Sequence, residues 1–126
     1  MSSISNNLDT IKQFLDTNIA THDAISSNIA NAETPNYKAV VPHFEAKLSQ
    51  AEARQDLLSH PKDKQWKLGL RIEKSEAPAR EDGNNVQIEQ EVSAMAENSM
   101  MYMSALKIFS KEASIAKYAI TSGGRG

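Results

Sequence analysis

A single apolar seam runs through the last third of the sequence and limits the folds open to the chain. From residue 88 to residue 120, mostly apolar positions recur at alternating steps of four and three, with no proline or glycine between them. This heptad spacing predicts one long amphipathic helix that packs against another helix. The seam consists of Ile88, Val92, Met95, Ser99, Tyr102, Leu106, Phe109, Ala113, Ala116 and Ile120.

Turn residues mark both ends of this helix. Asp82-Gly83-Asn84 is a turn sequence, and Asn84 with Gln87 has the spacing of a capping box. Gly123-Gly124 follows the last apolar position and predicts the C-terminal end of the helix.

The N-terminal sequence predicts a partner helix. The same pattern of fours and threes places Asn18 and His22 as two polar positions in the middle of a second seam. Isolated helices of this length are marginal in water, so the two helices need each other or neighbouring subunits. We predict a mainly α protein whose N- and C-terminal helices form an antiparallel coiled-coil-like pair, with register fixed by the polar positions. The apolar members of the N-terminal seam are Ile4, Leu8, Ile11, Leu15, Ile25 and Ile29.

The segment between the helices has a different character, because residues 45–82 hold 16 of the 30 charged residues. The spacing of Phe44, Leu48, Ala51 and Leu58 predicts a short amphipathic helix over residues 44–58. Alternation of apolar and polar residues from Trp66 onward predicts a strand, with Val40-Val41 as a candidate partner. The expected organisation is a helix and corner over 1–44, a charged insert of short helix and β-hairpin character over 45–83, and a helix over 84–126, within one structural domain.

Between the first helix and the insert lies the sequence SNIANAETPNYKA, residues 27–39. Asn28 and Asn31 are poor interior helix residues, and their side chains favour bonds to free carbonyls at a helix end. Proline forces Thr34 out of helical conformation, and Asn36 tolerates a left-handed backbone. We therefore expect a specified corner here rather than a helix that merely ends.

Composition excludes several classes of function. A net charge of −2 argues against a nucleic-acid-binding protein. The absence of cysteine excludes disulfides, thiolate catalysis and Cys-ligated zinc. His22 and His43 have no His, Asp or Glu three or four residues after them, and His60 has Asp63 alone. No glycine-rich phosphate loop is present, so we expect no enzyme, metal or cofactor. There is no apolar run long enough to span a membrane and no cleavable signal pattern at the N-terminus. Met100, Met101 and Met103 favour a partner surface.

Residues 27–38 resemble the N-terminal signature of the bacterial flagellar axial proteins, S-N-[IL]-A-N-A-x-T-P-G-Y-[KR], with Asn36 in place of the usual glycine. The stretch DGNNVQIEQEVSAMAENSMMY, residues 82–102, resembles the C-terminal helix of the proximal rod members of that family. The resemblance implies a motif at a subunit interface, formed by Ser27, Asn28, Ile29, Ala30, Asn31, Thr34, Pro35, Asn36, Tyr37 and Lys38.

The same resemblance implies a structural subunit of the proximal rod of the flagellar basal body, which polymerises through its terminal helices and connects the MS ring and export gate to the distal rod. The implied partners are other copies of the chain, rod proteins of the FlgC, FlgF and FlgG types, the FliE adaptor, the MS ring and the flagellar type III export apparatus. The implied location is the periplasmic rod, reached without a cleaved signal peptide.

Two alternatives stay open from the sequence. One is another short rod protein of the FlgC type, although that pattern usually has extra residues in the loop after the asparagine motif. The other is a free-standing coiled-coil adaptor or export chaperone, whose helices would satisfy each other within a monomer or dimer.

Overall fold

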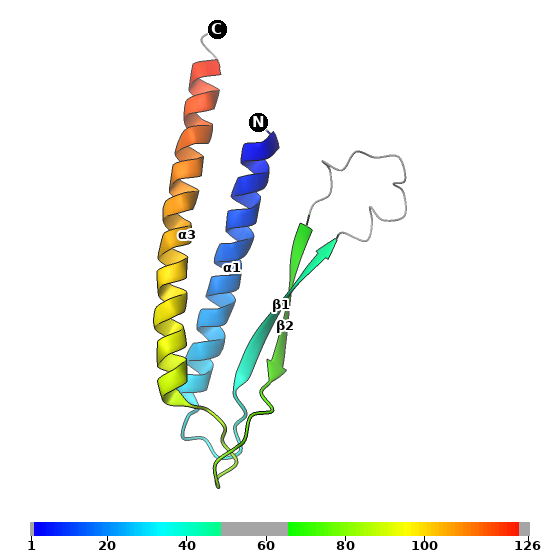
Figure 1. Ribbon diagram of the computed structural model, residues 1–126, viewed down its shortest axis with the longest axis vertical. Helices are drawn as coiled ribbons and strands as arrows, with labels where there is room; N and C mark the ends of the chain where they lie inside the picture. Colours follow the sequence, from blue (N-terminus) through cyan, green and yellow to red (C-terminus); the bar gives the residue numbers. More distant parts are fainter. Residues whose placement is uncertain (1, 49–65, 124–126) are drawn as a thin grey trace.

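The computed structural model describes residues 2–48 and 66–123 of the chain. Its elements follow the order helix, strand, strand, helix (Figure 1): α1 over Ser2–Ala30, β1 over Val40–Leu48, β2 over Trp66–Lys74 and α3 over Ile88–Gly123. The prediction of a mainly α protein with two long terminal helices and a small hairpin is confirmed.

The two helices run antiparallel along the length of the molecule (Figure 1). With 29 and 36 residues, α1 is about 43 Å long and α3 about 54 Å. Their register is marked by Asn98, whose Nδ2 donates to the carbonyl oxygen of Asn18 at 2.8 Å. Because the helices are antiparallel, Ser114 lies level with Ser2: it is as many residues after Asn98 as Ser2 is before Asn18. Residues 115–123 of α3 therefore extend beyond the start of α1, and we call them the overhang.

The face that α3 turns toward α1 differs from its predicted seam, and its buried side chains are small. Asn98 and Ala105 are its buried residues, and Tyr102 and Phe109 beside them are half-buried. The contact face is rotated by about one residue from the predicted seam, because Asn98 and Ala105 face α1 in place of Ser99 and Leu106. Small side chains at this face let the two helix axes approach closely. Four seam residues are consequently exposed: Ile88 by 43%, Val92 by 53%, Leu106 by 39% and Ile120 by 61%. The other predicted seam residues of α3 are half-buried: Met95, Ser99, Tyr102, Phe109, Ala113 and Ala116.

On α1 the predicted seam does face inward. Ile25 and the polar Asn18 are buried, whereas His22 is exposed. The Nδ2 of Asn18 has no hydrogen-bond partner within the described residues, so this buried amide is only partly satisfied. The half-buried members are Ile4, Leu8, Ile11, Leu15 and Ile29.

The hairpin pairs β1 with β2 in antiparallel register, with Phe44 opposite Leu70. The expected helix over 44–58 is wrong at its start, because Phe44 and Leu48 lie on β1; residues 49–58 lie outside the described part of the chain. The cause is a competing alternation: Pro42 and Phe44 share a strand face opposite Ile72 and Leu70. β1 also crosses the boundary expected between residues 44 and 45.

The hairpin packs on α1, on the side away from α3 (Figure 1). Between the two elements lies a small pocket, lined by Phe44, Leu68 and Leu70 of the hairpin and by Gln13, Thr17 and Ala20 of the helix. On the opposite strand face, Arg71 and His43 pair with Glu73 at 2.6 and 3.3 Å. These ion pairs are exposed and contribute little to stability.

Candidate functional site: the asparagine corner

At the end of the helix pair, residues 27–40 and 75–87 fold together into a structure that we call the asparagine corner (Figure 1). Its apolar content is small: Ala32, Ala39 and Val86 are buried together, with Tyr37 packed against them. Three asparagines are buried as deeply, namely Asn28 at 2%, Asn84 at 0% and Asn85 at 5% exposed. Buried amides are stable only when hydrogen-bonded, so the corner depends on their partners.

Asn28 connects α1 to both β1 and α3. Its Oδ1 accepts from the amide of Val40 at 2.8 Å, and its Nδ2 donates to the carbonyl oxygen of Val40 at 3.0 Å. The same Nδ2 donates to Oε2 of Glu91 at 3.2 Å, and the hydroxyl of Tyr37 donates to Oδ1 at 3.3 Å. All polar atoms of this side chain are therefore engaged with three different parts of the fold.

The side-chain amides of Asn31 and Asn84 donate to carbonyl oxygens at and just after the C-terminal end of α1. The Nδ2 of Asn31 donates to the carbonyl oxygen of Ser27 at 2.8 Å. The Nδ2 of Asn84 donates to the carbonyl oxygens of Asn31 at 2.8 Å and Thr34 at 2.9 Å. Nη2 of Arg80 adds a bond of 2.6 Å to the carbonyl oxygen of Ala32. Nearby backbone amides also bond the carbonyls of Asn31 and Thr34, so Asn84, some 50 positions away, adds a second donor to each of them.

The role of Asn84 differs from the predicted capping box. Because α3 begins at Ile88, Asn84 lies too far upstream to cap it. Its Oδ1 instead accepts from the amide of Val86 at 2.8 Å, a local turn typical of asparagine. This frees its Nδ2 to hold the end of α1.

Asn85 fixes the crossing of the two chain segments. Its Oδ1 accepts from the amide of Ala39 at 2.7 Å, and its Nδ2 donates to the carbonyl oxygens of Ser75 at 3.0 Å and Ala77 at 3.1 Å. The segment before α3 is thereby joined to the chain on both sides of the hairpin.

A close approach of Asn36 and Gly83 closes the corner. Asn36 has a φ of 61°, which confirms the left-handed conformation expected where the motif usually has glycine. Gly83 has a φ of 82°, and a Cβ on it would lie 2.3 Å from Oδ1 of Asn36. The amide of Asn36 donates to the carbonyl oxygen of Asp82 at 2.8 Å, and Nζ of Lys38 donates to that of Gly83. Glycine is required at position 83 by conformation and by space.

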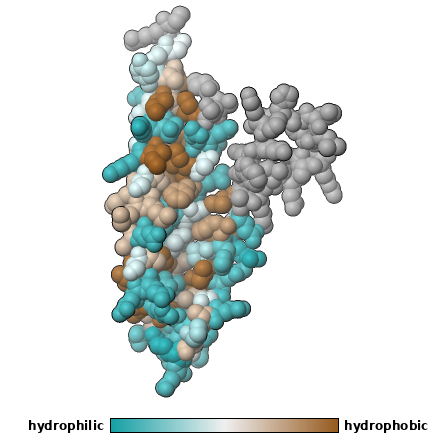
Figure 2. Space-filling view, in the orientation of Figure 1, coloured by the Kyte–Doolittle hydropathy of each residue, from teal (hydrophilic) through white to brown (hydrophobic). Residues whose placement is uncertain are grey.

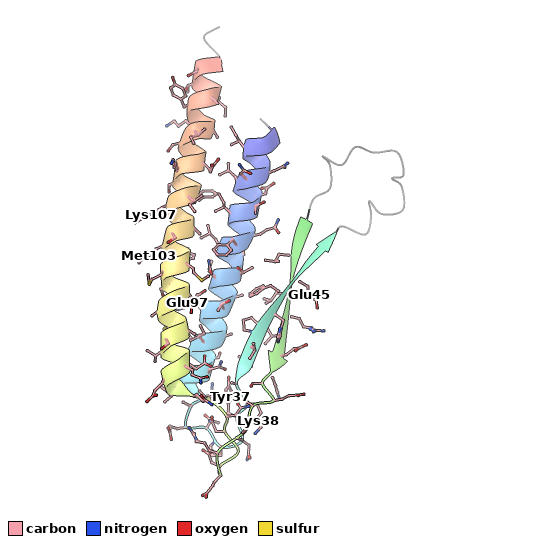
Figure 3. All side chains as sticks on the ribbon, in the orientation of Figure 1. Tyr37, Lys38, Glu45, Glu97, Met103 and Lys107 are labelled. Atoms are coloured by element: carbon pink, nitrogen blue, oxygen red, sulfur yellow. The ribbon has the colours of Figure 1, made fainter. Side chains whose placement is uncertain are left out.

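Two titratable groups report this environment. The pKa of Asp82 is lowered, first by the amide of Asn84, which donates to its carboxylate at 3.0 Å, and then by the Arg80 guanidinium. The pKa of Tyr37 is raised, first by burial and then by the negative charge of Glu91. Tyr37 and Lys38 lie together at the corner (Figure 3).

The corner brings only part of the predicted motif inward. Asn28, Asn31, Tyr37 and Lys38 make bonds across it, whereas Ser27 offers its carbonyl. Ile29 is half-buried, and the exposed residues of the motif are Ser27, Ala30, Thr34, Pro35 and Asn36.

Sequence reasoning missed three participants, Arg80, Asn84 and Asn85, in these roles. For Asn84 and Asn85, the available signal was that two adjacent asparagines follow Asp82-Gly83. The predicted capping box assigned a role to Asn84 and none to Asn85.

The hydrogen bonds of the corner position α1, the hairpin and α3 relative to one another. Within residues 2–48 and 66–123, no group of three His, Asp or Glu side chains is placed to hold a metal ion. No described helix is long and apolar enough to cross a membrane.

The family model for the flagella basal body rod protein matches residues 18–38, which cover the C-terminal part of α1 and the turn that follows it in the corner. This short match indicates the flagellar basal body rod class, and relatives that cover most of the chain show it.

Relatives narrow the class. The flagellar basal body rod protein FlgB of Borreliella burgdorferi is 34% identical over 116 residues, covering 81% of this chain and 86% of the relative. The chain belongs to the FlgB family of flagellar basal body rod proteins. FlgB of Bacillus subtilis is 24% identical over 98% of this chain and 99% of its own, and FlgB of Aeromonas hydrophila is 33% identical over 73% and 75%. The family is one of structural proteins of the basal body.

Proposed function

We propose that this chain is a subunit of the proximal rod, polymerising through α1 and α3 and connecting the MS ring and export gate to the distal rod. The observation that carries the proposal is the amount of apolar surface that the fold leaves uncovered on α3. Met100, Met103 and Ile108 are exposed by 71%, 62% and 53%. Exposed apolar residues this numerous on one helix are typical of a surface that neighbouring subunits cover.

The asparagine corner has a defined part in this function. Its hydrogen bonds fix the angle at which the hairpin and α3 leave the end of α1, so each copy presents its helices in the same geometry. A regular polymer needs subunits of uniform shape, since small differences in angle accumulate along the assembly.

The proposed partners are other copies of the chain, rod proteins of the FlgC, FlgF and FlgG types, the FliE adaptor, the MS ring and the type III export apparatus. Family membership supports assembly in the basal body, and the chain's place next to the MS ring is our proposal. We propose further that the chain reaches the periplasm through the type III apparatus without a cleaved signal peptide.

Electron microscopy of cell envelopes from a strain lacking this chain tests the function. We expect MS rings without rods or hooks, and restoration of both by the intact gene. Complete basal bodies in the deletion strain would contradict the proposal and favour a coiled-coil adaptor or chaperone.

A further inference from the structure

An apolar groove runs between α1 and α3 in their N-terminal and central parts, respectively. Its volume is about 630 Å³, and its walls include Ile11 and Phe14 of α1 and Met101 and Ile108 of α3, with Glu97 at one end. Phe14 and Ile108 are exposed by 42% and 53% although they line a concave surface. Figure 2 shows hydrophobic residues gathered along the helix pair, whereas the corner end is mostly hydrophilic. The groove therefore offers a place for a further apolar element.

The wall that α3 contributes continues past the groove. Met101, Ile108, Ile115 and Tyr118 lie along one side of the helix, and the polar residues Glu97, Ser104 and Lys111 occupy the positions between them at steps of four and three. Ile115 and Tyr118, in the overhang, are exposed by 45% and 74%. A stripe with heptad spacing that runs through a groove and beyond it is typical of a surface that receives another helix.

A second apolar surface lies on the other side of α3, and we call it the outer flank. It consists of Ile88, Val92, Met103 and Leu106, which are exposed by 43%, 53%, 62% and 39%. At 100° per residue, this flank and the groove wall lie about 160° apart around the helix. In Figure 3, Met103 and the nearby Lys107 lie on the side of α3 away from α1.

We propose that the outer flank of one copy docks into the groove of a second copy of this chain, a contact that rests on the proposed function. Two different apolar surfaces on nearly opposite sides of one helix cannot both be covered by a symmetric pair, in which each copy uses the same surface. A head-to-tail contact covers both surfaces and repeats indefinitely, as an assembly with rotational or helical order requires.

Charge favours the same arrangement. Glu97 lies at one end of the groove and Lys107 lies near Met103 of the outer flank, so the contact places these opposite charges at its edge; Lys111 lies beyond the groove, further along the same side of α3. A second copy is therefore the occupant that both shape and charge support.

Cysteine cross-linking tests the contact cleanly, because the natural chain has no cysteine. Met101→Cys marks the groove and Met103→Cys marks the outer flank; both side chains are exposed, so neither change should disturb the fold. The two full-length variants are expressed together in the deletion strain, treated with a short bismaleimide, and examined in isolated basal bodies. Ala77→Cys, exposed and remote from both surfaces, replaces Met103→Cys in the control.

We expect dimers that contain one copy of each variant in at least tenfold excess over those formed by either variant alone, and none above background with Ala77→Cys. Dimers formed by Met101→Cys alone would indicate a symmetric contact and would overturn the inference. Basal bodies that contain both variants but yield no mixed dimer would also overturn it, while leaving the proposed function intact. Absence of the chain from basal bodies would instead contradict the proposed function.

Discussion

The side chain of Asn28 bonds to Val40 as a neighbouring β-strand would, accepting from its amide at 2.8 Å and donating to its carbonyl at 3.0 Å. The first residue of β1 thus receives its pairing on this side from a helix residue twelve positions earlier. An amide side chain is the neutral group that can supply a donor and an acceptor at this spacing. The asparagine in the motif is therefore a specific requirement of the turn from helix to strand.

Asn28→Ala should lower the free energy of unfolding by about 3 kcal/mol, because the bonded groups of Val40, Tyr37 and Glu91 lose their partner in a buried place. Asn7→Ala, an exposed asparagine on the same helix, is the matched control and should change the value by less than about 0.5 kcal/mol. Urea unfolding followed by circular dichroism measures both. Equal effects of the two variants would mean that the corner bonds contribute nothing.

Gly83→Ala should destabilise the fold by about 2 kcal/mol, since it combines a left-handed backbone with a Cβ 2.3 Å from Oδ1 of Asn36. Gly123→Ala has nothing within 4 Å of the new Cβ and should be neutral or slightly stabilising. Asn36→Gly removes the obstructing oxygen and should recover part of the loss in the double variant. Thermal melts of the natural chain, Gly83→Ala, Asn36→Gly and the double variant give the comparison, with Gly123→Ala as the control, and full additivity of the two single changes would refute the proposed contact.

Ala105→Asp and Leu106→Asp change adjacent residues but should affect different properties: the first should prevent folding, and the second should leave the chain folded but unable to assemble. Ala105 is 4% exposed and faces α1, so a carboxylate there is buried without a partner and should prevent folding. Leu106 is 39% exposed on the outer flank, so its change should cost about 1 kcal/mol or less and leave a folded chain. Circular dichroism reports folding, and swimming assays with microscopy of basal bodies report assembly. Motile cells carrying Leu106→Asp would argue against a role for this flank.

Acid should weaken the corner through Asp82. Its pKa in the folded chain lies below the ordinary value of 3.8, because the charged form is held by the amide of Asn84 and by Arg80. The stabilisation is therefore present above about pH 4 and is lost as the pH falls through the folded pKa. Asp82→Asn keeps an acceptor for the amide of Asn84 but does not titrate. The melting temperature of the natural chain should fall more steeply between pH 5 and pH 2 than that of the variant, and parallel curves would contradict this.

Hydrogen exchange should distinguish the overhang of α3 from the rest of that helix and from the asparagine corner. Amides in the overhang, residues 115–123, have no helix beside them and should exchange quickly in the isolated chain. Amides held by buried side chains, such as those of Ala39 and Val40, should exchange most slowly. Mass spectrometry after timed labelling measures both, and protection of the overhang in assembled rods would indicate that a neighbour covers it. Uniform protection along α3 in the monomer would be the contrary result.

Periodicity predicted both helices and their pairing but not the side that α3 turns inward. The predicted and observed faces share Tyr102 and Phe109, and they differ in whether Leu106 or Ala105 lies between them. A helix that is apolar on several sides carries more than one acceptable heptad, and the choice depends on the partner. Because the partner of the large aliphatic residues is absent from a single chain, the sequence of that chain could not identify the inner face.

The hairpin and the corner show two further limits. Phe44 and Leu48 fit a helical spacing of four and also a strand spacing of two, so only the strand across from them decided the outcome. Asn36 could be assigned a left-handed backbone from its place in a glycine position, because that preference is local. The donors of Asn84 reach Asn31, 53 residues earlier, and no local pattern carries that information.

Such distances also impose an order of events while the chain is being made, because synthesis proceeds from the N-terminus. The bond between Asn28 and Glu91 joins residues 63 positions apart, and that between Asn18 and Asn98 joins residues 80 apart. Until Glu91 has emerged, Asn28 has no α3 to hold and the end of α1 lacks its distant donors. Contacts between residues far apart in the sequence form slowly, so the asparagine corner should close late in folding. The corner can therefore take its final angle only after the chain has been made as far as Glu91, the residue that Asn28 bonds on α3.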